Sequence, residues 1–477
     1  MTGRGSQFEA GDRHFLVRSQ LAGSRVRLLI LLVLVAAMGA LVYAGLTFAG
    51  GWRAHRGEAK YIWVQMLADR GGESGGRLVR AIVTDGDRCP VIALSAGDVA
   101  MKRRAPRVAS AYPILLCEAE LDDAGDARVG PRRLPLRPAE ANDIVLIGDT
   151  GCRLVHYDRP QRCHSGVDWP LGAVAVSAAS ATTTPGARPI IIHVGDFHYR
   201  EKPCADADPG CSGSPFGDNW ATWEEEFFKP ATPLLLAAPW IILRGNHENC
   251  ERAGAGWLFF FALPNQTWDG VCQDDRPPYG VAIGRGPDGA RRALIVFDTA
   301  NEADRYKIAD HCTTYEKWLD DIDTENTEIW LALHQPLWFR GTEEESGASA
   351  SPTPPVQRCE KGTTKNAVDA LRLRLSTGKP NIKLILSGDV HMFEVFTPDD
   401  AKVPVQIVAG NGGTRLDPLK KPDPDKPAPI DHVSEPINSF GVTGAITAFS
   451  RYGFVVLRRG DAEWTASMRD KVGRQVV

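Results

Sequence analysis

The sequence predicts an α/β protein in which a small β domain precedes a larger domain of alternating strands and helices, behind one N-terminal membrane helix. Three observations predict this. Residues 28–49 carry no charge, residues 57–140 hold short β-like runs between turn residues, and from Asp143 apolar strands alternate with helical stretches. Apolar strands separated by helices are typical of a sheet that is covered on both faces. We expect a tail at 1–27, a membrane anchor at 28–50, the small β domain at 51–140 and the large domain at 141–477.

The uncharged stretch at 28–49 is the candidate membrane segment. Its 22 residues would form a helix about 33 Å long, enough to cross the apolar core of a bilayer. The stretch is long for a signal peptide, but Thr47-Phe48-Ala49 loosely resembles a cleavage site, so a cleaved signal is the alternative. The arginines upstream outnumber the basic residues just downstream. This bias predicts a single-pass membrane protein with a cytoplasmic N-terminus and an extracytoplasmic body, in the periplasm or at the cell surface.

All ten cysteines follow this stretch, which predicts disulfides. An even number of cysteines on the exported side of a membrane is typical of an oxidising compartment. A zinc cluster is the alternative, but the sequence has no CxxC pair to support it. Pairing of neighbours along the chain would close modest loops. These pairs are 89–117, 152–163, 204–211, 250–272 and 312–359.

The charge balance excludes one class of partner. The formal net charge of the 477 residues is −4, and such a near-neutral chain is not expected to bind nucleic acid.

The small β domain is predicted from four short runs, YIWVQMLA, RLVRAIV, PVIALSA and YPILLCEAEL, which Gly, Asp, Pro and Arg clusters separate. This spacing is typical of antiparallel strands. The runs contain no reactive constellation, and the Pro- and Arg-rich stretch at 128–142 marks the boundary.

The large domain is predicted from longer apolar runs. The strand candidates are DIVLIG, PIIIHVG, WIILRG, RRALIVFD, EIWLAL and IKLILSG. The helix candidates are 219–237, 301–321 and 364–376, and the late segments 403–409, 444–449 and 453–459 are expected to form a second sheet. Two Pro-rich stretches, 341–357 and 417–437, are expected to be surface loops.

Polar residues follow five of the apolar strands at the point where each strand ends. The residues are Asp149, then Asp196 with Tyr199, then Asn246 and His247, then His334, and last Asp389 and His391. The carboxyl edge of an open α/β sheet is where ligands bind. A single acidic residue at a strand end ordinarily belongs to a turn or forms an ion pair, and a single histidine is ordinarily a core residue. All of them together are typical of a site that holds two metal ions.

These motifs resemble the calcineurin-like metallophosphoesterase superfamily over roughly residues 143–460. The motifs, in chain order, are Gly148-Asp149-Thr150-Gly151, Gly195-Asp196, Gly245-Asn246-His247-Glu248, His334 and Gly388-Asp389-Val390-His391. The GNHE block is the most specific of them. The resemblance implies an αββα sandwich of two sheets, so that 141–477 would be the catalytic domain.

Within that superfamily the chain is similar to purple acid phosphatases. Most members carry a metal-binding histidine where this chain has Gly151, and Tyr199, three residues after Asp196, would replace it as a tyrosinate on ferric iron. A phenol ionises readily only beside a strongly charged metal. Asp389 stands where purple acid phosphatases have histidine, and the wording GDVH is shared with PhoD-like phosphatases.

The resemblance implies two metal ions, Fe(III) and one divalent ion among Mn, Fe, Zn, Mg and Ca. One would be held by Asp149, Tyr199, His391 and the bridging Asp196. The other would share Asp196 and take Asn246, His334 and Asp389. The aspartate makes the second position about one unit more negative than a histidine would, which moves its preference from zinc toward harder ions.

The resemblance further implies a phosphoesterase in which the metals lower the pKa of a water that attacks phosphorus. Asp196 and His247 would be the catalytic residues, with His247 at the leaving group as general acid. We expect a phosphorylated small-molecule or lipid-linked substrate. The alternatives are a phosphodiesterase or pyrophosphatase acting on lipid-linked or nucleotide substrates, and a catalytically silent envelope-binding protein.

Overall fold

The structure, a computed structural model, describes most of the chain after residue 57. The described residues are 58–69, 75–104, 110–122, 125–136, 140–264, 272–286, 289–301, 311–322, 327–340, 367–378, 381–419, 431–460 and 463–477. The candidate membrane segment at 28–50 lies outside them. Within these ranges no helix has the length and apolar character that crossing a membrane requires. Glu58–Asp85 and Cys89–Val477 form one compact unit.

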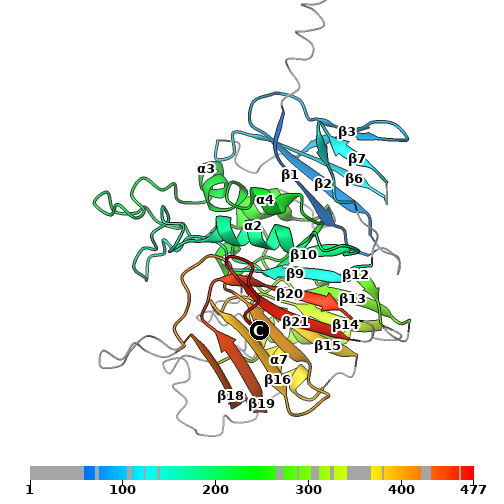
Figure 1. Ribbon diagram of the computed structural model, residues 1–477, viewed down its shortest axis with the longest axis vertical. Helices are drawn as coiled ribbons and strands as arrows, with labels where there is room; N and C mark the ends of the chain where they lie inside the picture. The colour runs from blue at the N-terminus through cyan, green and yellow to red at the C-terminus, as the bar shows by residue number, and fades with distance from the viewer. Residues whose placement is uncertain are drawn as a thin grey trace, which may run out of the picture. The chain divides into compact units, whose positions relative to one another are not determined.

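A nine-stranded sheet carries the first three predicted strands at its centre (Figure 1). Their sequences DIVLI, PIIIH and WII are fully buried, as central parallel strands must be. The strand order is β21 (Trp464–Asp470), β20 (Gly453–Arg459), β9 (Asp143–Ile147), β10 (Pro189–His193), β11 (Trp240–Ile242), β1 (Ala59–Met66), β2 (Arg77–Val83), β6 (Leu115–Leu121) and β5 (Lys102–Arg104). β9, β10, β11 and β1 run parallel, and the other pairs are antiparallel.

An eight-stranded sheet contains the next three predicted strands. Its order is β12 (Tyr279–Arg285), β13 (Arg291–Val296), β14 (Thr327–Ala332), β15 (Ile382–Ser387), β17 (Val405–Ala409), β16 (Phe393–Pro398), β19 (Val442–Phe449) and β18 (His432–Ser439). β13, β14, β15 and β17 are parallel. Apolar side chains from both sheets, such as Leu146 and Ile192 on one and Leu294 and Leu386 on the other, form one core between them.

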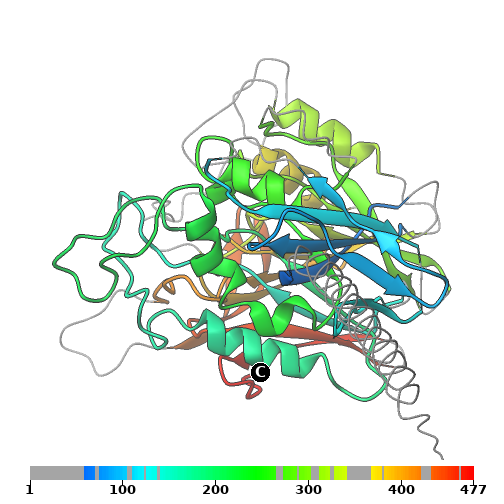
Figure 2. The ribbon, with the colours of Figure 1, turned by 90° about the horizontal axis from the view of Figure 1, so that it is seen from above.

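Helices cover the outer face of each sheet, which gives the four layers of an αββα sandwich. The first sheet is covered by α2 (Leu171–Ala181), α3 (Trp220–Trp223), the π-helical turn η1 (Glu224–Phe228), α4 (Thr232–Leu235) and α5 (Gly254–Phe261). The second is covered by α6 (His311–Asp320) and α7 (Ala367–Ser376). Seen from above, α2 and α7 lie on opposite sides of the sheets (Figure 2).

The region 58–136 is β-rich and its main strands are antiparallel, as expected. β3 (Val91–Leu94), β4 (Val99–Ala100), β7 (Ala127–Val129) and β8 (Arg132–Arg133) form a four-stranded sheet of their own. One face of β1 and β2 packs with this sheet in a separate core, which includes Ile62 and Val79. The domain boundary at residue 140 stays a prediction.

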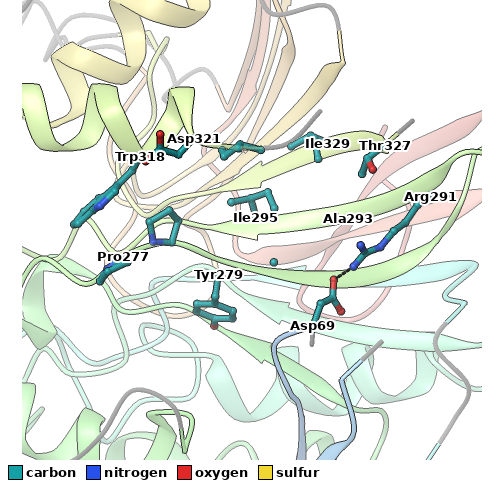
Figure 3. Close-up of a pocket in the computed structure, with 13 residues that line it drawn as sticks. Asp69, Pro277, Tyr279, Arg291, Ala293, Ile295, Trp318, Asp321, Thr327 and Ile329 are labelled. Carbon is teal, nitrogen blue, oxygen red and sulfur yellow. Dashed lines mark hydrogen bonds and ion pairs between the residues drawn. The ribbon is translucent and has the colours of Figure 1, made fainter. Parts of the chain in front are cut away.

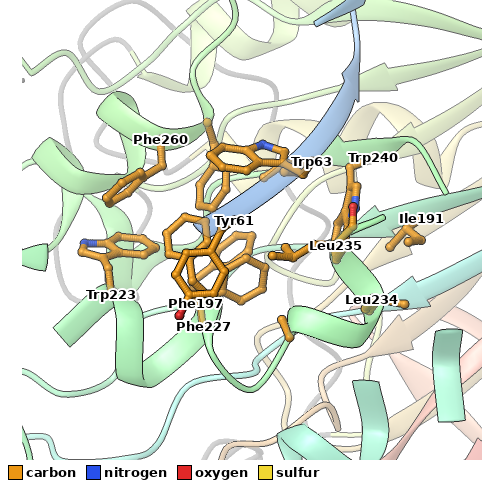
Figure 4. Close-up of a cluster of buried hydrophobic side chains, with 14 of the residues drawn as sticks. Tyr61, Trp63, Ile191, Phe197, Trp223, Phe227, Leu234, Leu235, Trp240 and Phe260 are labelled. Atoms are coloured by element: carbon orange, nitrogen blue, oxygen red, sulfur yellow. The ribbon is translucent and has the colours of Figure 1, made fainter. Parts of the chain in front are cut away.

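The other face of β1 packs into the helical layer of the large sheet. Tyr61 and Trp63 enter an aromatic cluster with Phe228 and Phe261 (Figure 4), where ring centroids lie 5.4–5.9 Å apart. The buried Arg80 of β2 donates to the carbonyl oxygens at the end of α5, at 2.7 Å from Phe260 O and 2.6 Å from Ala262 O. Through these contacts the β-rich region packs against the helical layer of the sandwich.

Two expectations for the late segments were wrong. The segment 453–459 is β20, which pairs with β9 in the first sheet rather than joining 403–409 and 444–449 in the second. A buried, two-sided apolar strand fits the centre of either sheet, so its partner depends on long-range packing. The predicted loop at 417–437 is cut short by β18, whose side chains alternate between exposed and half-buried.

Four predicted disulfides are present: Cys89–Cys117, Cys152–Cys163, Cys204–Cys211 and Cys250–Cys272. Cys312 is also disulfide-bonded, whereas Cys359 lies outside the described residues. The zinc alternative is therefore wrong for the paired cysteines, because a sulfur in a disulfide has no thiolate to offer a metal.

Candidate metal centre

The five strand ends named from the sequence converge, but they come from two sheets. β9, β10 and β11 are parallel, so Asp149, Asp196 and Asn246 follow their carboxyl ends at one edge of the first sheet. β14 and β15 deliver His334 and Asp389 at the matching edge of the second sheet. Gly388 N donates to His334 O at 2.8 Å, and Asp149 N donates to Gly195 O at 3.0 Å. These backbone bonds hold neighbouring loops together across each edge.

Three of the aspartates have a left-handed backbone. The φ angles are 52° for Asp149, 58° for Asp196 and 67° for Asp389. Aspartate tolerates this conformation better than most residues, and strained backbone of this kind gathers at functional sites.

Neighbouring glycines leave room for the carboxylates. A Cβ on Gly245 would lie 2.1 Å from Asp196 Oδ1, and one on Gly388 would lie 2.5 Å from Asp149 Oδ2. Gly245 and Gly388 of the sequence motifs are therefore required, because a carboxylate oxygen lies too close to each of them for a side chain to fit.

Asp149, Asp196 and His334 form the centre of the cluster. One ligand atom from each lies within 4.8 Å of the others, and all three side chains are buried. Burial raises the pKa of Asp149 to about 8. Burial also disfavours the charge of Asp196, but His334 and His247 outweigh it and hold the pKa of Asp196 well below its usual range. Burial lowers the pKa of His334, yet Asp196 and the other carboxylates raise it well above the usual range. Such packed acids require a compensating positive charge.

Tyr199 occupies the place that Gly151 leaves open. A Cβ on Gly151 would lie 2.9 Å from Tyr199 Cδ2 and 2.5 Å from Glu226 Oε1, so no larger residue fits there beside the tyrosine. The Tyr199 hydroxyl donates to Asp196 Oδ2 at 2.6 Å and lies 2.9 Å from His391 Nε2. Burial and the two carboxylates raise the pKa of Tyr199 well above its ordinary value. A strongly charged cation would therefore be needed to ionise it.

Two buried ligand atoms have no hydrogen-bond partner among the described residues: Asn246 Oδ1 and His334 Nε2. His334 Nδ1 lies 2.7 Å from Val194 O and must carry a proton to donate there, so the neutral ring would present the lone pair of Nε2 to a metal ion. A buried acceptor without a donor costs about 1–3 kcal/mol. Metal coordination would satisfy both atoms, so the residues present fit a metal ion.

His391 and Asp389 complete the cluster. His391 Nε2 lies 3.6 Å from Asp149 Oδ1, and Asp389 Oδ1 lies 3.5 Å from His334 Nε2. Asp417, which the sequence did not single out, accepts from His391 N at 2.9 Å and lies 3.5 Å from His391 Nδ1. Burial lowers the pKa of His391, but Asp417 outweighs it and raises that pKa above its usual value.

His247 stands beside the cluster in an orientation that a carboxylate sets. Its Nδ1 lies 2.7 Å from Glu201 Oε1, and its Nε2 lies 4.0 Å from Asp196 Oδ2. Its ring centroid is 3.9 Å from that of Tyr199. Burial lowers the pKa of His247, against the effect of Asp196 and Glu201. Nε2 is therefore the nitrogen directed toward the centre.

Glu248 and Glu226 support the site, and sequence reasoning gave neither a role. Glu248 accepts four backbone N–H bonds of 2.8–3.0 Å, from Gly245 and from 196–198. Glu226 Oε1 accepts from Cys152 N and Tyr199 N at 2.8 and 2.9 Å. The supporting role of Glu248 could have been predicted from its place in the GNHE block. Glu226 lies on a turn far along the chain, and no motif around it points to a role in the site.

Two further histidines are structural. His193 stacks on Phe197 with centroids 3.6 Å apart, as expected of a core residue. His198 is buried and its Nε2 lies 3.1 Å from Gly217 O, so it supports the adjoining loop.

A cavity of about 400 Å³ lies elsewhere, along β12, β13, β14 and α6 (Figure 3). Asp69 and Arg291 form an ion pair at one end of it, and Trp318 and Pro277 stand at the other. None of the candidate metal ligands lines it.

Comparison with known proteins gives one family and several similar structures, of which two are described. The calcineurin-like phosphoesterase model matches residues 140–393. No curated protein sequence matches the chain. A purple acid phosphatase from yellow lupin (Lupinus luteus) seeds is similar in structure, with 14% identity over 88% of this chain and 73% of that one and a TM-score of 0.50. The structure of PhoD is similar with 11% identity over 89% of this chain and 93% of that one and a TM-score of 0.49.

Proposed function

We propose that the chain, which belongs to the calcineurin-like phosphoesterase family of metal-dependent phosphoric ester hydrolases, is a phosphoesterase with a two-metal centre at the converging strand ends. The observation that carries this proposal is the buried cluster of Asp149, Asp196 and His334, next to two ligand atoms that lack a hydrogen-bond partner among the described residues. The alternative of a catalytically silent protein is set aside, because the family is one of enzymes.

The side chains divide between two metal positions. We assign Asp149, Tyr199 and His391 to one position, and Asn246, His334 and Asp389 to the other, with Asp196 shared. This division is supported by the hydroxyl of Tyr199, which meets Asp149, Asp196 and His391, and by His334 Nε2, which faces Asp196 and Asp389. A ferric ion suits the phenol of the first position, and a hard divalent ion suits the oxygen-rich second position.

The metals, when bound, supply the positive charge that holds phosphate oxygens and acidifies water. The chain's own residues hold the catalytic side chains in place and supply the proton for the leaving group. Glu201 holds His247 through Nδ1 and favours its protonated form, from which Nε2 can donate a proton to the departing alcohol. Glu248 keeps the loop of Asp196 rigid through four backbone bonds.

The test compares three variants by metal content and by hydrolysis of an aryl phosphate monoester, with a diester alongside. We expect Asn246→Ala to lose metal, and to lose more activity than the roughly 10–100-fold that an outer-shell partner costs. We expect His247→Ala to keep its metal and to lose about 10²–10⁴-fold in turnover. Asn438→Ala, on the exposed end of β18, is the matched control. Full metal content and activity in Asn246→Ala would refute the assigned centre.

We propose further that the catalytic region lies outside the cytoplasm, anchored by residues 28–50. The proposal is supported by the uncharged 22-residue stretch and by four disulfides, which persist in oxidising compartments. Anchorage would place the site near lipid-linked as well as small phosphorylated substrates. Protease added to spheroplasts, whose cytoplasmic membrane is intact, should remove the catalytic region and leave a cytoplasmic control protein intact. Protection of both would refute the proposed location.

A further inference from the structure

A disulfide-closed loop, Cys152–Cys163, runs beside the proposed metal centre. It begins three residues after Asp149, and Leu154 N donates to Tyr199 O at 3.0 Å. Its two cysteines pack with the Cys204–Cys211 pair in one small core. The disulfide and these contacts fix both ends of the loop next to the centre.

Arg153 of this loop contacts the centre directly. Its Nη1 lies 2.8 Å from His391 Nδ1, and its guanidinium carbon is 5.9 Å from the centroid of the Tyr199 ring. The side chain is only 15% exposed. A largely buried cation so close to candidate ligands has either a structural partner or an anionic ligand to bind.

The partners of Arg153 leave much of the guanidinium unused. Its Nε faces Asp158 at 3.0 Å without forming a hydrogen bond, and that carboxylate also pairs with Arg415 at 2.8 Å. Nη2 forms no hydrogen bond with the described residues, and Asp417 also contributes negative charge near this guanidinium. Two guanidinium groups thus share one carboxylate, and Arg153 keeps free donors of the geometry that phosphate oxygens accept.

Tyr157 of the same loop is exposed beside that arginine. Its side chain is 56% exposed, and the guanidinium carbon of Arg153 lies 5.8 Å from its ring centroid. Arg153 is thus near the rings of both Tyr157 and Tyr199.

We propose, on the basis of the proposed function, that Arg153 and Tyr157 are substrate-binding residues that select phosphate monoesters of aromatic alcohols over those of alkyl alcohols. Arg153 donates to a non-bridging phosphoryl oxygen, and the exposed ring of Tyr157 stacks on a planar leaving group. In the reaction the bond from phosphorus to the aryl oxygen breaks, a bond to a water oxygen forms, and one water proton goes to the departing oxygen.

The first test compares kcat/KM for 4-nitrophenyl phosphate and for glycerol 3-phosphate. We expect Tyr157→Ala to lose about 10-fold on the aryl ester only, and Tyr157→Phe to keep the parent value, because the ring carries the effect. Arg153→Ala should lose about 10–100-fold on both esters, with partial recovery in Arg153→Lys. Arg162→Ala is the matched control, since Arg162 lies in the same loop and is 67% exposed.

The second test is independent of turnover. Inorganic phosphate is titrated into the metal-loaded proteins by calorimetry, with metal content measured in parallel. We expect Arg153→Ala to bind phosphate about 10-fold or more weakly than the parent and Arg162→Ala, with its metal unchanged. Loss of metal from Arg153→Ala would instead make Arg153 a positioning residue for His391, and equal phosphate affinity in all three proteins would overturn its role in binding.

The two proposals fail in different ways. If the parent hydrolyses neither ester, the proposed function fails, and phosphate binding still decides the role of Arg153. If the parent hydrolyses both esters and Tyr157→Ala loses equally on both or on neither, the proposed function stands and the selectivity for aromatic alcohols is refuted.

Discussion

Asp389 is the residue that the sequence resemblance predicts to stand where purple acid phosphatases have histidine. Its backbone N donates to Asp149 Oδ2 at 3.2 Å, and its carboxylate lies 3.5 Å from His334 Nε2. A carboxylate is harder than an imidazole, so it favours manganese, magnesium, calcium or ferrous iron over zinc. Its left-handed φ of 67° is also accessible to histidine, so the exchange can be made without large strain.

We expect Asp389→His to shift metal preference toward zinc, because it removes about one negative charge and adds a ligand that zinc favours. Asp389→Ala should weaken the second metal, with activity recovering in part when excess metal is supplied. The measurement is activity across a manganese, calcium, magnesium and zinc series for the parent and both variants. Identical metal profiles would show that Asp389 is only a turn residue.

Glu394 links stability to pH. It is buried on β16, and burial raises its pKa to about 8, while the nearby Arg340 is paired with Glu435 at 2.6 Å. The unfolded chain releases this proton near pH 4.3, whereas the folded protein keeps it to about pH 8. The folded state binds more protons in that window, so this residue lowers stability as pH rises from about 4 to 8.

We therefore expect Glu394→Gln to raise Tm at pH 8 relative to the parent and to change it little at pH 4, since glutamine resembles the protonated acid. The measurement is thermal unfolding of both proteins at the two pH values. Glu435→Gln, which removes the other partner of Arg340, is the control that should lack this gain. An equal Tm difference at both pH values would show that Glu394 is not protonated in the fold.

At the scale of elements, the Cys152–Cys163 disulfide is expected to have two effects that can be measured separately. It stabilises the folded state, and it holds Arg153 where it can bind phosphate. We expect the double variant Cys152→Ser, Cys163→Ser, which opens a loop of sequence separation 11, to lose about 3 kcal/mol of unfolding free energy. Phosphate binding should weaken as well, because Arg153 would no longer be held beside the centre.

The matched control for this variant is Cys204→Ser with Cys211→Ser, a pair of sequence separation 7 that does not carry Arg153. Denaturant unfolding and phosphate calorimetry on both variants give the comparison. Parent-like phosphate affinity after loss of Cys152–Cys163 would show that the loop position does not depend on the bond.

At the scale of the whole molecule, the β-rich region and the sandwich share a sheet. β1 pairs with β11, and Tyr61 and Trp63 fill the aromatic cluster of the helical layer. Losing a buried aromatic side chain of this size costs about 3–5 kcal/mol. Few small proteins have the stability to lose two of them.

We expect a fragment of residues 141–477 to be unfolded or insoluble, whereas a fragment beginning at residue 58 folds. The measurement is the near-UV circular dichroism and Tm of the two fragments, prepared under oxidising conditions. A folded 141–477 fragment with the Tm of the longer one would establish the β-rich region as an independent domain.

The sequence by itself determined which candidate metal ligands lie at the strand ends. An apolar run followed by a polar residue, with a glycine before it at all but His334, is a local pattern, and parallel strands bring such ends to one edge. Asp149, Asp196, His334 and Asp389 could therefore be named from local patterns alone, as could the disulfides between cysteines that are neighbours along the chain. Most of the central strands could also be predicted from such patterns, because a strand that is buried on both faces is a continuous apolar run.

Only the tertiary structure decided how distant segments meet. The apolar run 453–457 fits either sheet, so β20 could be assigned to β9 only from packing. The close contacts of Gly151 with Tyr199 and Glu226, and the position of Arg153 beside His391, join residues far apart in the sequence. No periodicity or motif records such contacts. They depend on which side chains fill the remaining space once the two sheets have packed, because a close-packed interior leaves each position with few alternatives.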